Sequence, residues 1–488
     1  METVVNKTNK NGFGQRLKDL RDRAESFCTS NQFIFIVTFV AFIFHALALD
    51  FWGIALFAFA SALFFTVFKD FRPGMTVMLS AIFIVSTKNS PGYGTGDNYY
   101  LDPKILYPLI GVVGVLLVAM LIRCVRNRKN FLTGKSYIPL LILAVALTLS
   151  GVGRKYYSQS LPFGLLMGLT YVGLYVLFVG VVEKVDGLLD YVSTLLSAFC
   201  LLIAVQVAFF YVMHVSNGGT FGPYWKDEII IGWGVSNIVG EMIVFFMPFI
   251  VYKIERDKNH YLFYNFVAIL SMAMLVLTLN RTGMLFGAPM FAFLWIRAIL
   301  KNEDREKIIL FTVIFVSLGI ICLMSVLALT ELSDVFDYFG VMVNLEDGIH
   351  LSSRDLIWKQ AFQFFKDSPW IGEGFARSFN EPVMRLDATM FQTLSHNFII
   401  QAIGSGGIIG TAVMVAFALY MASRFLRKYD GNVYFISFAI LYACISLFDT
   451  TYFITYSVMF LMFILVVVEK LAPKKEKVKA RVLTAKTE

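Results

Sequence analysis

Long apolar segments recur along the whole chain and limit what it can fold into. Fourteen such segments lie between polar connections, several of them about as long as the roughly 20-residue helix that crosses a bilayer. The chain is 58% apolar and 16% charged, whereas soluble domains carry about 25% charged residues. These features predict an all-α polytopic membrane protein with about 12–14 transmembrane helices. The predicted spans are residues 33–48, 51–68, 74–87, 105–122, 137–151, 161–182, 188–213, 235–252, 261–279, 283–298, 308–329, 396–423, 433–448 and 452–469.

The distribution of lysine and arginine predicts the orientation of these spans. With the N-terminus inside, 31 of the 42 lysines and arginines fall in inside segments and tails, as the positive-inside rule requires. We therefore expect a multi-pass protein of the cell membrane with both termini in the cytoplasm. The net charge of +8 follows from this topology and from basic tails beside anionic lipids, and it does not indicate nucleic-acid binding.

One large loop interrupts the series of spans. The loop, residues 330–395, is predicted to be extracytoplasmic and carries ten acidic and five basic residues. It is therefore not a uniformly basic surface, and anion binding there would need individually placed arginines. The predicted organisation is a basic cytoplasmic tail over 1–32, about eleven spans over 33–329, the loop over 330–395, three spans over 396–469 and a basic cytoplasmic tail over 470–488.

The loop contains one clear helical pattern, in the stretch LSSRDLIWKQAFQFFKDSPWIGEGF. Ser352 with Asp355 forms a capping-box pattern, and Ser368-Pro369 ends the helix. Its apolar residues form a broad stripe on one side. We expect an amphipathic helix on the outer membrane interface or over the mouth of a cavity.

The stretch TLSHNFIIQAIGSGGIIG places His396 beside Asn397 at the start of the twelfth span. Ser395 or Thr393 is expected to cap this helix, so that His396 lies in its first turn at the outer surface. A neutral imidazole there can accept a proton and suits a general base; the alternative is an interfacial histidine bonded to a loop carbonyl. The glycines that follow predict close packing against a neighbouring helix, with Gly406 and Gly410 at a G-x-x-x-G spacing.

Two arginines are predicted at positions that disfavour a cation. Arg354 falls in the first turn of the amphipathic helix, where the helix dipole repels positive charge, so a shared anion would explain it. Arg281 lies in an outside turn of about three residues, against the positive-inside trend. The alternatives are a solvated Arg354 and an Arg281 that reaches into lipid headgroups. Trp358, one turn after Arg354, could contact a sugar ring or lipid.

Polar residues also open the eighth span. Asn237 and Glu241 lie one turn apart on the same face of an otherwise apolar segment. An intramembrane carboxylate is costly, so Glu241 is expected to face a wet cavity or a polar partner, for structure or for substrate contact. The chain has no D-x-D pair and no cysteine–histidine metal set, so a metal site and a cofactor are not expected.

Taken together, these motifs resemble the O-antigen ligase and Wzy-type polysaccharide polymerase family of bacterial envelope enzymes. The resemblance rests on Arg354, Trp358, SPWIGEGF, the Ser395-His396-Asn397 triplet and the glycine run, with Arg281 in NRTG and Asn237 upstream. It covers roughly residues 230 to 410. The motifs do not separate a ligase from a polymerase, and polymerase is slightly preferred.

The resemblance implies glycan transfer at the outer face of the bacterial cytoplasmic membrane. The donor would be an undecaprenyl-diphosphate-linked oligosaccharide, and the acceptor a glycan or lipid-linked sugar hydroxyl. Arg281 and Arg354 would neutralise the diphosphate, His396 would act as the base, and attack would invert the anomeric carbon. Asn397, Trp358, Asn237 and Glu241 are predicted to bind substrate. Membrane lipids and other polysaccharide-assembly proteins are the further expected partners.

Two other classes remain open from the sequence. A lipid-linked oligosaccharide flippase or polysaccharide transporter also has many spans, but its polar groups usually lie near mid-membrane. Here the charges gather at one face beside one large loop, which favours an enzyme. An outside-face glycosyltransferase of another kind is the third reading, ranked low because the first outside turn is short.

Overall fold

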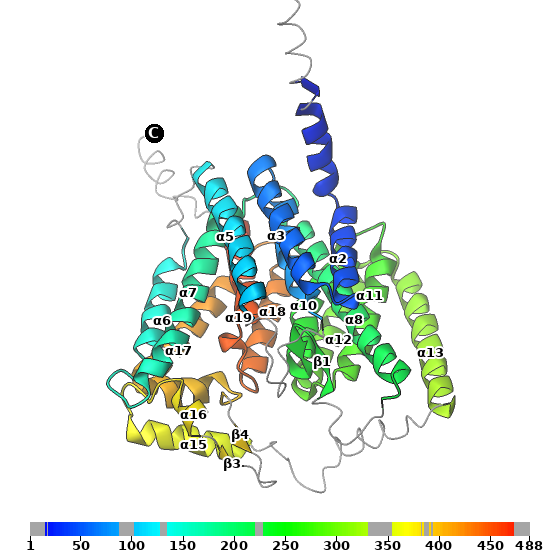
Figure 1. The fold of residues 1–488 in the computed structure, drawn as a ribbon. Helices are drawn as coiled ribbons and strands as arrows, with labels where there is room; N and C mark the ends of the chain where they lie inside the picture. Colours follow the sequence, from blue (N-terminus) through cyan, green and yellow to red (C-terminus); the bar gives the residue numbers. More distant parts are fainter. Residues whose placement is uncertain are drawn as a thin grey trace, which may run out of the picture.

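The computed structural model of the chain is a helical bundle (Figure 1). It describes residues 15–16, 18–86, 102–126, 134–219, 228–329, 354–381, 383–384, 390–391 and 394–472. The bundle has two distinct ends. The tail end is the end from which the helix Lys18–Cys28 projects, and the loop end is the opposite end, which carries α15 (Arg354–Asp367) and α16 (Arg377–Asn380).

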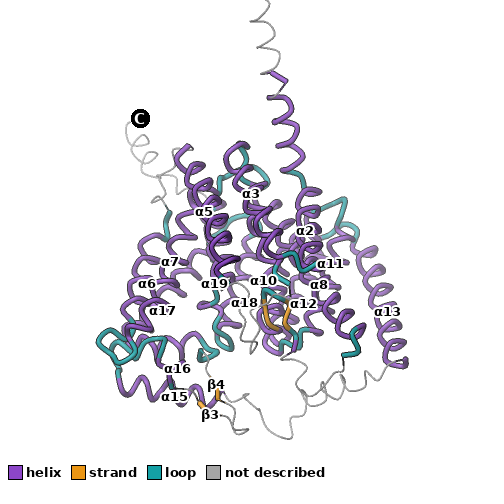
Figure 2. Tube along the Cα trace, in the orientation of Figure 1, coloured by secondary structure: helices purple, strands orange, loops and turns teal. Residues whose placement is uncertain are grey.

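Each of the fourteen predicted apolar segments coincides with one helix or with a helix and a short 3-10 helix next to it. Figure 2 shows how little of the described chain is strand: two small hairpins, β1 (Ile230–Ile231) with β2 (Gly234–Val235) and β3 (Val383–Met384) with β4 (Met390–Phe391). The bundle helices are α2 (Asn31–Ala46), α3 (Asp50–Val67), α4 (Arg72–Ser80) with η1 (Ala81–Ile84), α5 (Pro103–Arg126), α6 (Tyr137–Leu149), α7 (Tyr157–Val181), α8 (Leu188–Ser216), α10 (Ser236–Arg256), α11 (Tyr261–Leu277), α12 (Arg281–Lys301), α13 (Arg305–Leu329), α17 (Phe398–Phe425), α18 (Asn432–Ser446) and η5 (Thr451–Phe453) with α19 (Thr455–Leu471).

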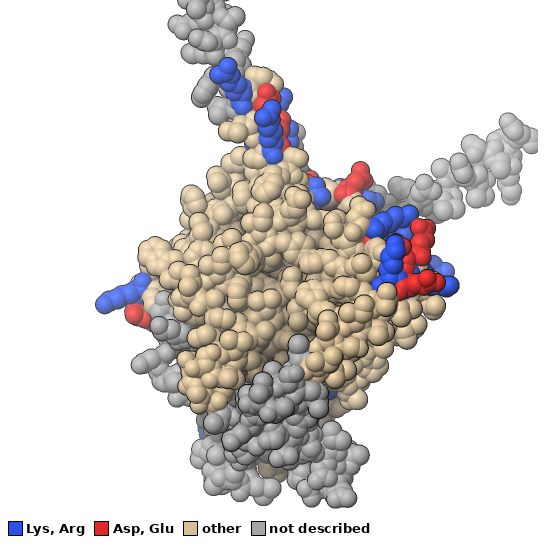
Figure 3. Space-filling model, turned by 90° about the vertical axis from the view of Figure 1, so that its right-hand side faces the viewer, with Lys and Arg blue, Asp and Glu red and all other residues tan. Residues whose placement is uncertain are grey.

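The helices have the length and surface of membrane spans. Among the described residues, seven helices are long and apolar enough to cross a bilayer, or eight if the pair Lys18–Cys28 and Asn31–Ala46, bent by 74°, is one span. Figure 3 shows a broad uncharged surface over the middle of one side, with charged side chains gathered toward the tail end. The predicted class, an all-α polytopic membrane protein, is confirmed. The count of 12–14 spans stays a prediction, because helices such as α6, with 13 residues and a length of about 20 Å, are shorter than the roughly 30 Å hydrocarbon core.

Helix α10 forms the centre of the bundle. It is buried along most of its length and packs against α8, α11, α12 and α18. A helix surrounded on all sides needs apolar residues all round, and the segment EMIVFFMPFIVYKI supplies them. Its first turn lies at the loop end, so Asn237 and Glu241 begin a helix that the rest of the bundle holds in place.

Helix α17 is broken at Gly407. The residue has φ 59° and ψ −155°, which ends one helical segment and starts another. Gly406 and Gly410 are buried and face the end of α6, on which α17 packs: an added Cβ would meet Ser150 Oγ at 3.3 Å from Gly406 and at 3.9 Å from Gly410. Gly404 lies close to α15, since a Cβ there would lie 3.3 Å from the Ala361 backbone.

The turn 369–374 after α15 is hydrogen-bonded into this break. The N–H groups of Ile408 and Ile409 donate to the carbonyls of Pro369 and Trp370, at 2.8 and 3.1 Å. In return, the N–H groups of 373 and 374 donate to the carbonyls of 404 and 405, at 3.1 and 2.9 Å. Backbone groups that lose their helical partners need others, and the turn provides them. Only glycine fits at Gly407, because a Cβ there would lie 2.6 Å from the Trp370 backbone.

Candidate active site

A histidine and an aspartate meet at the loop end. His396 Nδ1 lies 3.2 Å from Asp449 Oδ1, and Asp449 belongs to the connection between α18 and η5. The side chain of Asp449 is 9% exposed and that of His396 is 24% exposed, so the pair stands at the edge of the protein interior. The imidazole can therefore reach a substrate while its partner stays shielded.

Asp449 is held as a carboxylate. Burial opposes its ionisation, but the hydrogen bond and charge of His396, the Thr450 N–H and the charge of Arg354 outweigh burial and lower the pKa of Asp449 to about 2. An ionised carboxylate can only accept, so a neutral form of the ring would hold its hydrogen on Nδ1, toward Asp449. The Nε2 nitrogen then carries the lone pair that a general base needs.

His396 precedes helix α17 and does not lie in its first turn. Asn397 is the N-cap, and its Oδ1 accepts from the N–H groups of Ile399 and Ile400 at 2.9 and 3.0 Å. The prediction of a Ser395 or Thr393 cap is wrong for Ser395, and Thr393 is outside the described residues. Asparagine competes with serine for this role, and Asn397 also donates to Leu447 O at 2.7 Å. These contacts give Asn397 a structural task, and its substrate contact stays a prediction.

The backbone of His396 is left-handed, with φ 47°. For a residue other than glycine this conformation costs about 1–2 kcal/mol, and such strain tends to persist at functional sites where the surroundings impose it. The strained residue lies directly between the capping Asn397 and the buried Ser395. The direction of the imidazole is therefore set by the fold of the chain on both sides of it.

Arg354 faces the same acids. It interacts electrostatically with Asp449, Glu241 and Arg281. Burial lowers its pKa; the two carboxylates oppose that effect and Arg281 adds to it. Within the described part of the chain, Arg354 forms no ion pair within 4 Å and no hydrogen bond. It is a partly buried cation near acids that it does not bond.

Arg281 is the first residue of α12, and the turn before it is tightly fixed. Asn280 caps α12 by accepting from Gly283 N at 2.8 Å, and its amide donates to Asn237 O at 2.6 Å. The turn therefore joins the starts of α10 and α12. The side chain of Arg281 is exposed, and like Arg354 it stands at a helix N-terminus, where an anion would be favoured.

Asn237 and Glu241 line the buried side of the site. Asn237 Nδ2 lies 3.4 Å from Asp449 Oδ2. Glu241, one turn later, is 1% exposed and interacts with Asp449. One of its carboxyl oxygens, Oε2, is buried without a hydrogen-bond partner among the described residues. The expected polar partner is thus another carboxyl group, and substrate contact by either residue stays a prediction.

Trp358 is placed close to His396 by a hydrogen bond to the preceding residue. Its indole Nε1 donates to Ser395 O at 2.8 Å, and the ring is partly buried. The apolar face of α15, formed by Ile357, Ala361 and Phe364, packs toward α17. The contact of Trp358 with a sugar ring stays a prediction.

Asp449 was not among the site residues predicted from the sequence. The residue follows His396 by 53 positions and stands in the stretch LFDTTYF between two apolar segments. A signal was present, since it is an acidic residue in a short outside turn that the predicted topology places on the same side as His396. Arg377, at the loop end, has a structural role: it forms ion pairs with Asp367, Glu373 and Glu381. The loop residues His350 and Arg385 are outside the described residues.

Comparison with known families agrees with this geometry. Residues 266–415 match the O-antigen ligase family. The matched segment holds Arg281, Arg354, Trp358, His396 and Asn397, whereas Asn237, Glu241 and Asp449 lie outside it. No curated protein matches the chain.

The fold and the site thus define an all-α membrane protein with a loop-end cluster of one imidazole, carboxylates and arginines. The match to the O-antigen ligase family over residues 266–415 confirms the predicted resemblance. It supports, in general terms, a membrane polysaccharide ligase or polymerase.

Proposed function

We propose that the protein is a metal-independent, inverting glycosyltransferase of the bacterial cytoplasmic membrane. It would transfer a glycan from an undecaprenyl-diphosphate carrier to a sugar hydroxyl, with the loop end outside and both termini in the cytoplasm. The observation that carries the proposal is the pairing of His396 with a buried carboxylate beside two arginines that have no ion pair among the described residues.

The arginines would receive the leaving group. As the bond between the anomeric carbon and the diphosphate oxygen breaks, its electron pair stays on that oxygen, and negative charge grows there. Arg354 and Arg281 each offer a planar fork of N–H donors that suits phosphate oxygens. A hydrogen bond to a charged group contributes about 1.5–3 kcal/mol, so the two together can supply roughly 10²–10⁴ in rate.

His396 would activate the acceptor. Its Nε2 takes the proton of the acceptor hydroxyl while the hydroxyl oxygen forms the new bond to the anomeric carbon, on the face opposite the diphosphate. The imidazolium that results is stabilised by Asp449, which is already ionised. General base catalysis of this kind contributes about 10²–10⁴ in rate.

The direct test is transfer by the purified protein. Undecaprenyl-diphosphate-linked oligosaccharides from the cells that make the protein would be incubated with it, and product size would be followed on a gel. Longer glycans, or glycan moved to a lipid acceptor, are expected, and the reaction should continue in EDTA. A strict requirement for a divalent ion would contradict the role given to the arginines.

The same preparation distinguishes the competing function. In sealed vesicles a flippase would move labelled lipid-linked sugar across the bilayer without changing glycan length. The charged groups described at the loop end, away from the middle of the bundle, favour the enzyme. Between the two enzyme types, we favour a polymerase. A polymerase would add repeat units to a lipid-linked glycan, whereas a ligase would transfer the glycan to a lipid A core.

A further inference from the structure

The peptide before His396 is held from two sides. The Ser395 N–H donates to Gln401 Oε1 at 2.7 Å, and the Ser395 carbonyl accepts from Trp358 Nε1 at 2.8 Å. Gln401 lies in the first turn of α17 and Trp358 lies in α15. Gln401 is in turn fixed by Ser405, since its Nε2 donates to Ser405 Oγ at 2.6 Å. We call Trp358 and Gln401 the Ser395 clamp.

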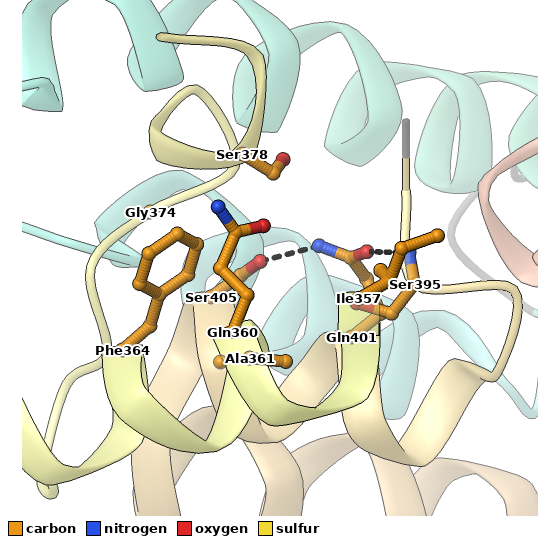
Figure 4. Close-up of a pocket in the computed structure, with 10 residues that line it drawn as sticks. Ile357, Gln360, Ala361, Phe364, Gly374, Ser378, Ser395, Gln401 and Ser405 are labelled. Atoms are coloured by element: carbon orange, nitrogen blue, oxygen red, sulfur yellow. Dashed lines mark hydrogen bonds between the residues drawn. The ribbon is translucent and has the colours of Figure 1, made fainter. Parts of the chain in front are cut away.

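The surroundings of Gln401 are too tight for a substrate. Figure 4 shows Gln401 between Ser395 and Ser405, with α15 packed over them. The cavity at this place is about 10 Å³, which is room for a single water molecule. Gln401 is buried. Its polar groups therefore serve the protein itself: one of its two bonds reaches Ser395, the residue before His396, and the other reaches Ser405.

The clamp explains why His396 keeps its left-handed backbone. A φ of 47° is unfavourable for histidine unless both neighbours are fixed. Asn397 is fixed by its cap bonds and by Leu447 O, and Ser395 is fixed by the clamp. With both flanking peptides held, the Cα–Cβ bond of His396 can point only toward Asp449.

We propose that Trp358 and Gln401 are positioning residues that orient the His396 imidazole through the Ser395 peptide. The proposal rests on the role given to His396 under the proposed function. It assigns Trp358 a task other than sugar contact, and it gives a function to Gln401. The backbone part of the proposal can be tested without any substrate.

The first experiment compares glycine with alanine at position 396 by thermal unfolding in detergent. Both His396→Gly and His396→Ala remove the ring, so their difference reports the cost of the left-handed backbone. With the clamp intact, the glycine variant should unfold at a higher temperature than the alanine variant. In a Gln401→Ala, Trp358→Phe background this difference should disappear. An equal difference in both backgrounds would overturn the proposal.

The second experiment uses free imidazole. Gln401→Ala should lower kcat about ten- to hundredfold, because a ring displaced by about 1 Å loses that much, while the donor KM changes less than twofold. In a His396→Gly background supplied with imidazole, Gln401→Ala should have no further effect, since free imidazole does not depend on the Ser395 peptide. An equal loss in the imidazole-rescued enzyme would mean a general disturbance of the site and would refute the positioning role.

Matched variants sharpen both experiments. Gln401→Glu keeps an oxygen for the Ser395 N–H and should retain more activity than Gln401→Ala. Ser405→Ala removes only the second bond of Gln401 and should cost less than Gln401→Ala. If imidazole restores nothing, the unfolding comparison decides alone. Full activity of His396→Gly without imidazole would instead refute the base, and with it the proposed function, whatever the unfolding comparison gives.

Discussion

The two ends of the bundle treat their charges differently. At the tail end, Lys253 is 2% exposed and bonds Asp190 at 2.5 Å and Asp257 at 3.0 Å. In the same region Glu255 bonds Arg297 at 2.6 Å. At the loop end, Arg354 interacts with Asp449, Glu241 and Arg281, yet within the described ranges neither arginine forms an ion pair within 4 Å.

The difference separates charges that are bonded to one another from charges whose hydrogen-bond donors stay available to a ligand. A buried ion pair with good geometry satisfies both partners and leaves little for a ligand. Cations held near acids but not bonded to them keep their donors for an incoming anion, at a cost in stability that the rest of the fold must offset. We therefore expect substitutions at the loop end to change activity more than stability, and substitutions at the tail end to do the reverse.

The largest expected effect is the loss of the base. His396→Ala should reduce glycan transfer by about 10²–10⁴-fold, while expression and membrane insertion stay normal. The measurement is the rate of product formation on gels at equal amounts of purified protein. Activity within a factor of three of the parent enzyme would remove His396 from the mechanism.

The arginines come next, with a tail-end arginine as the matched control. Arg354→Lys and Arg281→Lys should each lower turnover about 10- to 100-fold, because a point charge replaces a fork of donors. Arg297→Lys, at the bonded end, should leave turnover within about twofold and lower the unfolding temperature instead. Equal losses for Arg354→Lys and Arg297→Lys would erase the distinction between the two ends.

A smaller effect is expected for Asp449→Asn, about tenfold on kcat, since the amide no longer stabilises the imidazolium.

The Asp449→Asn variant should also remove a pH dependence of the free energy of unfolding. The pKa of Asp449 in the folded protein, about 2, lies below its ordinary value of 3.8, so the unfolded chain binds the proton more tightly. The stabilisation, about 2–3 kcal/mol, is complete above pH 3.8 and is lost as pH falls through 2. Unfolding curves of both proteins over this range would reveal it; parallel curves would contradict it.

The smallest effect on activity belongs to the tail end. Lys253→Met removes one partner of a buried cluster and leaves Asp190 and Asp257 without it. It should lower the unfolding temperature while kcat stays within about twofold. A loss of turnover as large as that of Asp449→Asn would show that the two ends are coupled.

Much of the fold could be predicted because its information is local. An apolar run of span length has few alternatives, and each predicted segment became a helix. His396, Arg281 and Arg354 could be predicted because each sits at the start of a helix or in a short turn, where its charge stands out from an apolar background. Whether they act as predicted is a question for the variants above.

The features that could not be predicted depend on contacts between segments that are distant in the sequence. Asp449 can be recognised as a site residue only from its contact with His396, which precedes it by 53 positions in the sequence. The break at Gly407 could not be separated from helix packing, since a glycine run serves both purposes. The cap could fall at Ser395 or Asn397, two residue types with the same capping ability. In each case the sequence allowed two local solutions and the tertiary structure chose between them.

The turn seated in the broken helix has a practical consequence for anyone who wishes to redirect the enzyme to other acceptors. If segment 354–395 alone were exchanged between two relatives, the grafted turn would have to form the four main-chain hydrogen bonds at the break with a helix of the host protein. That helix did not evolve with the graft. A chimera should therefore carry residues 396–410 as well, together with the 150–151 corner that also bonds the turn. The part of the chain that must be exchanged together is therefore larger than the loop.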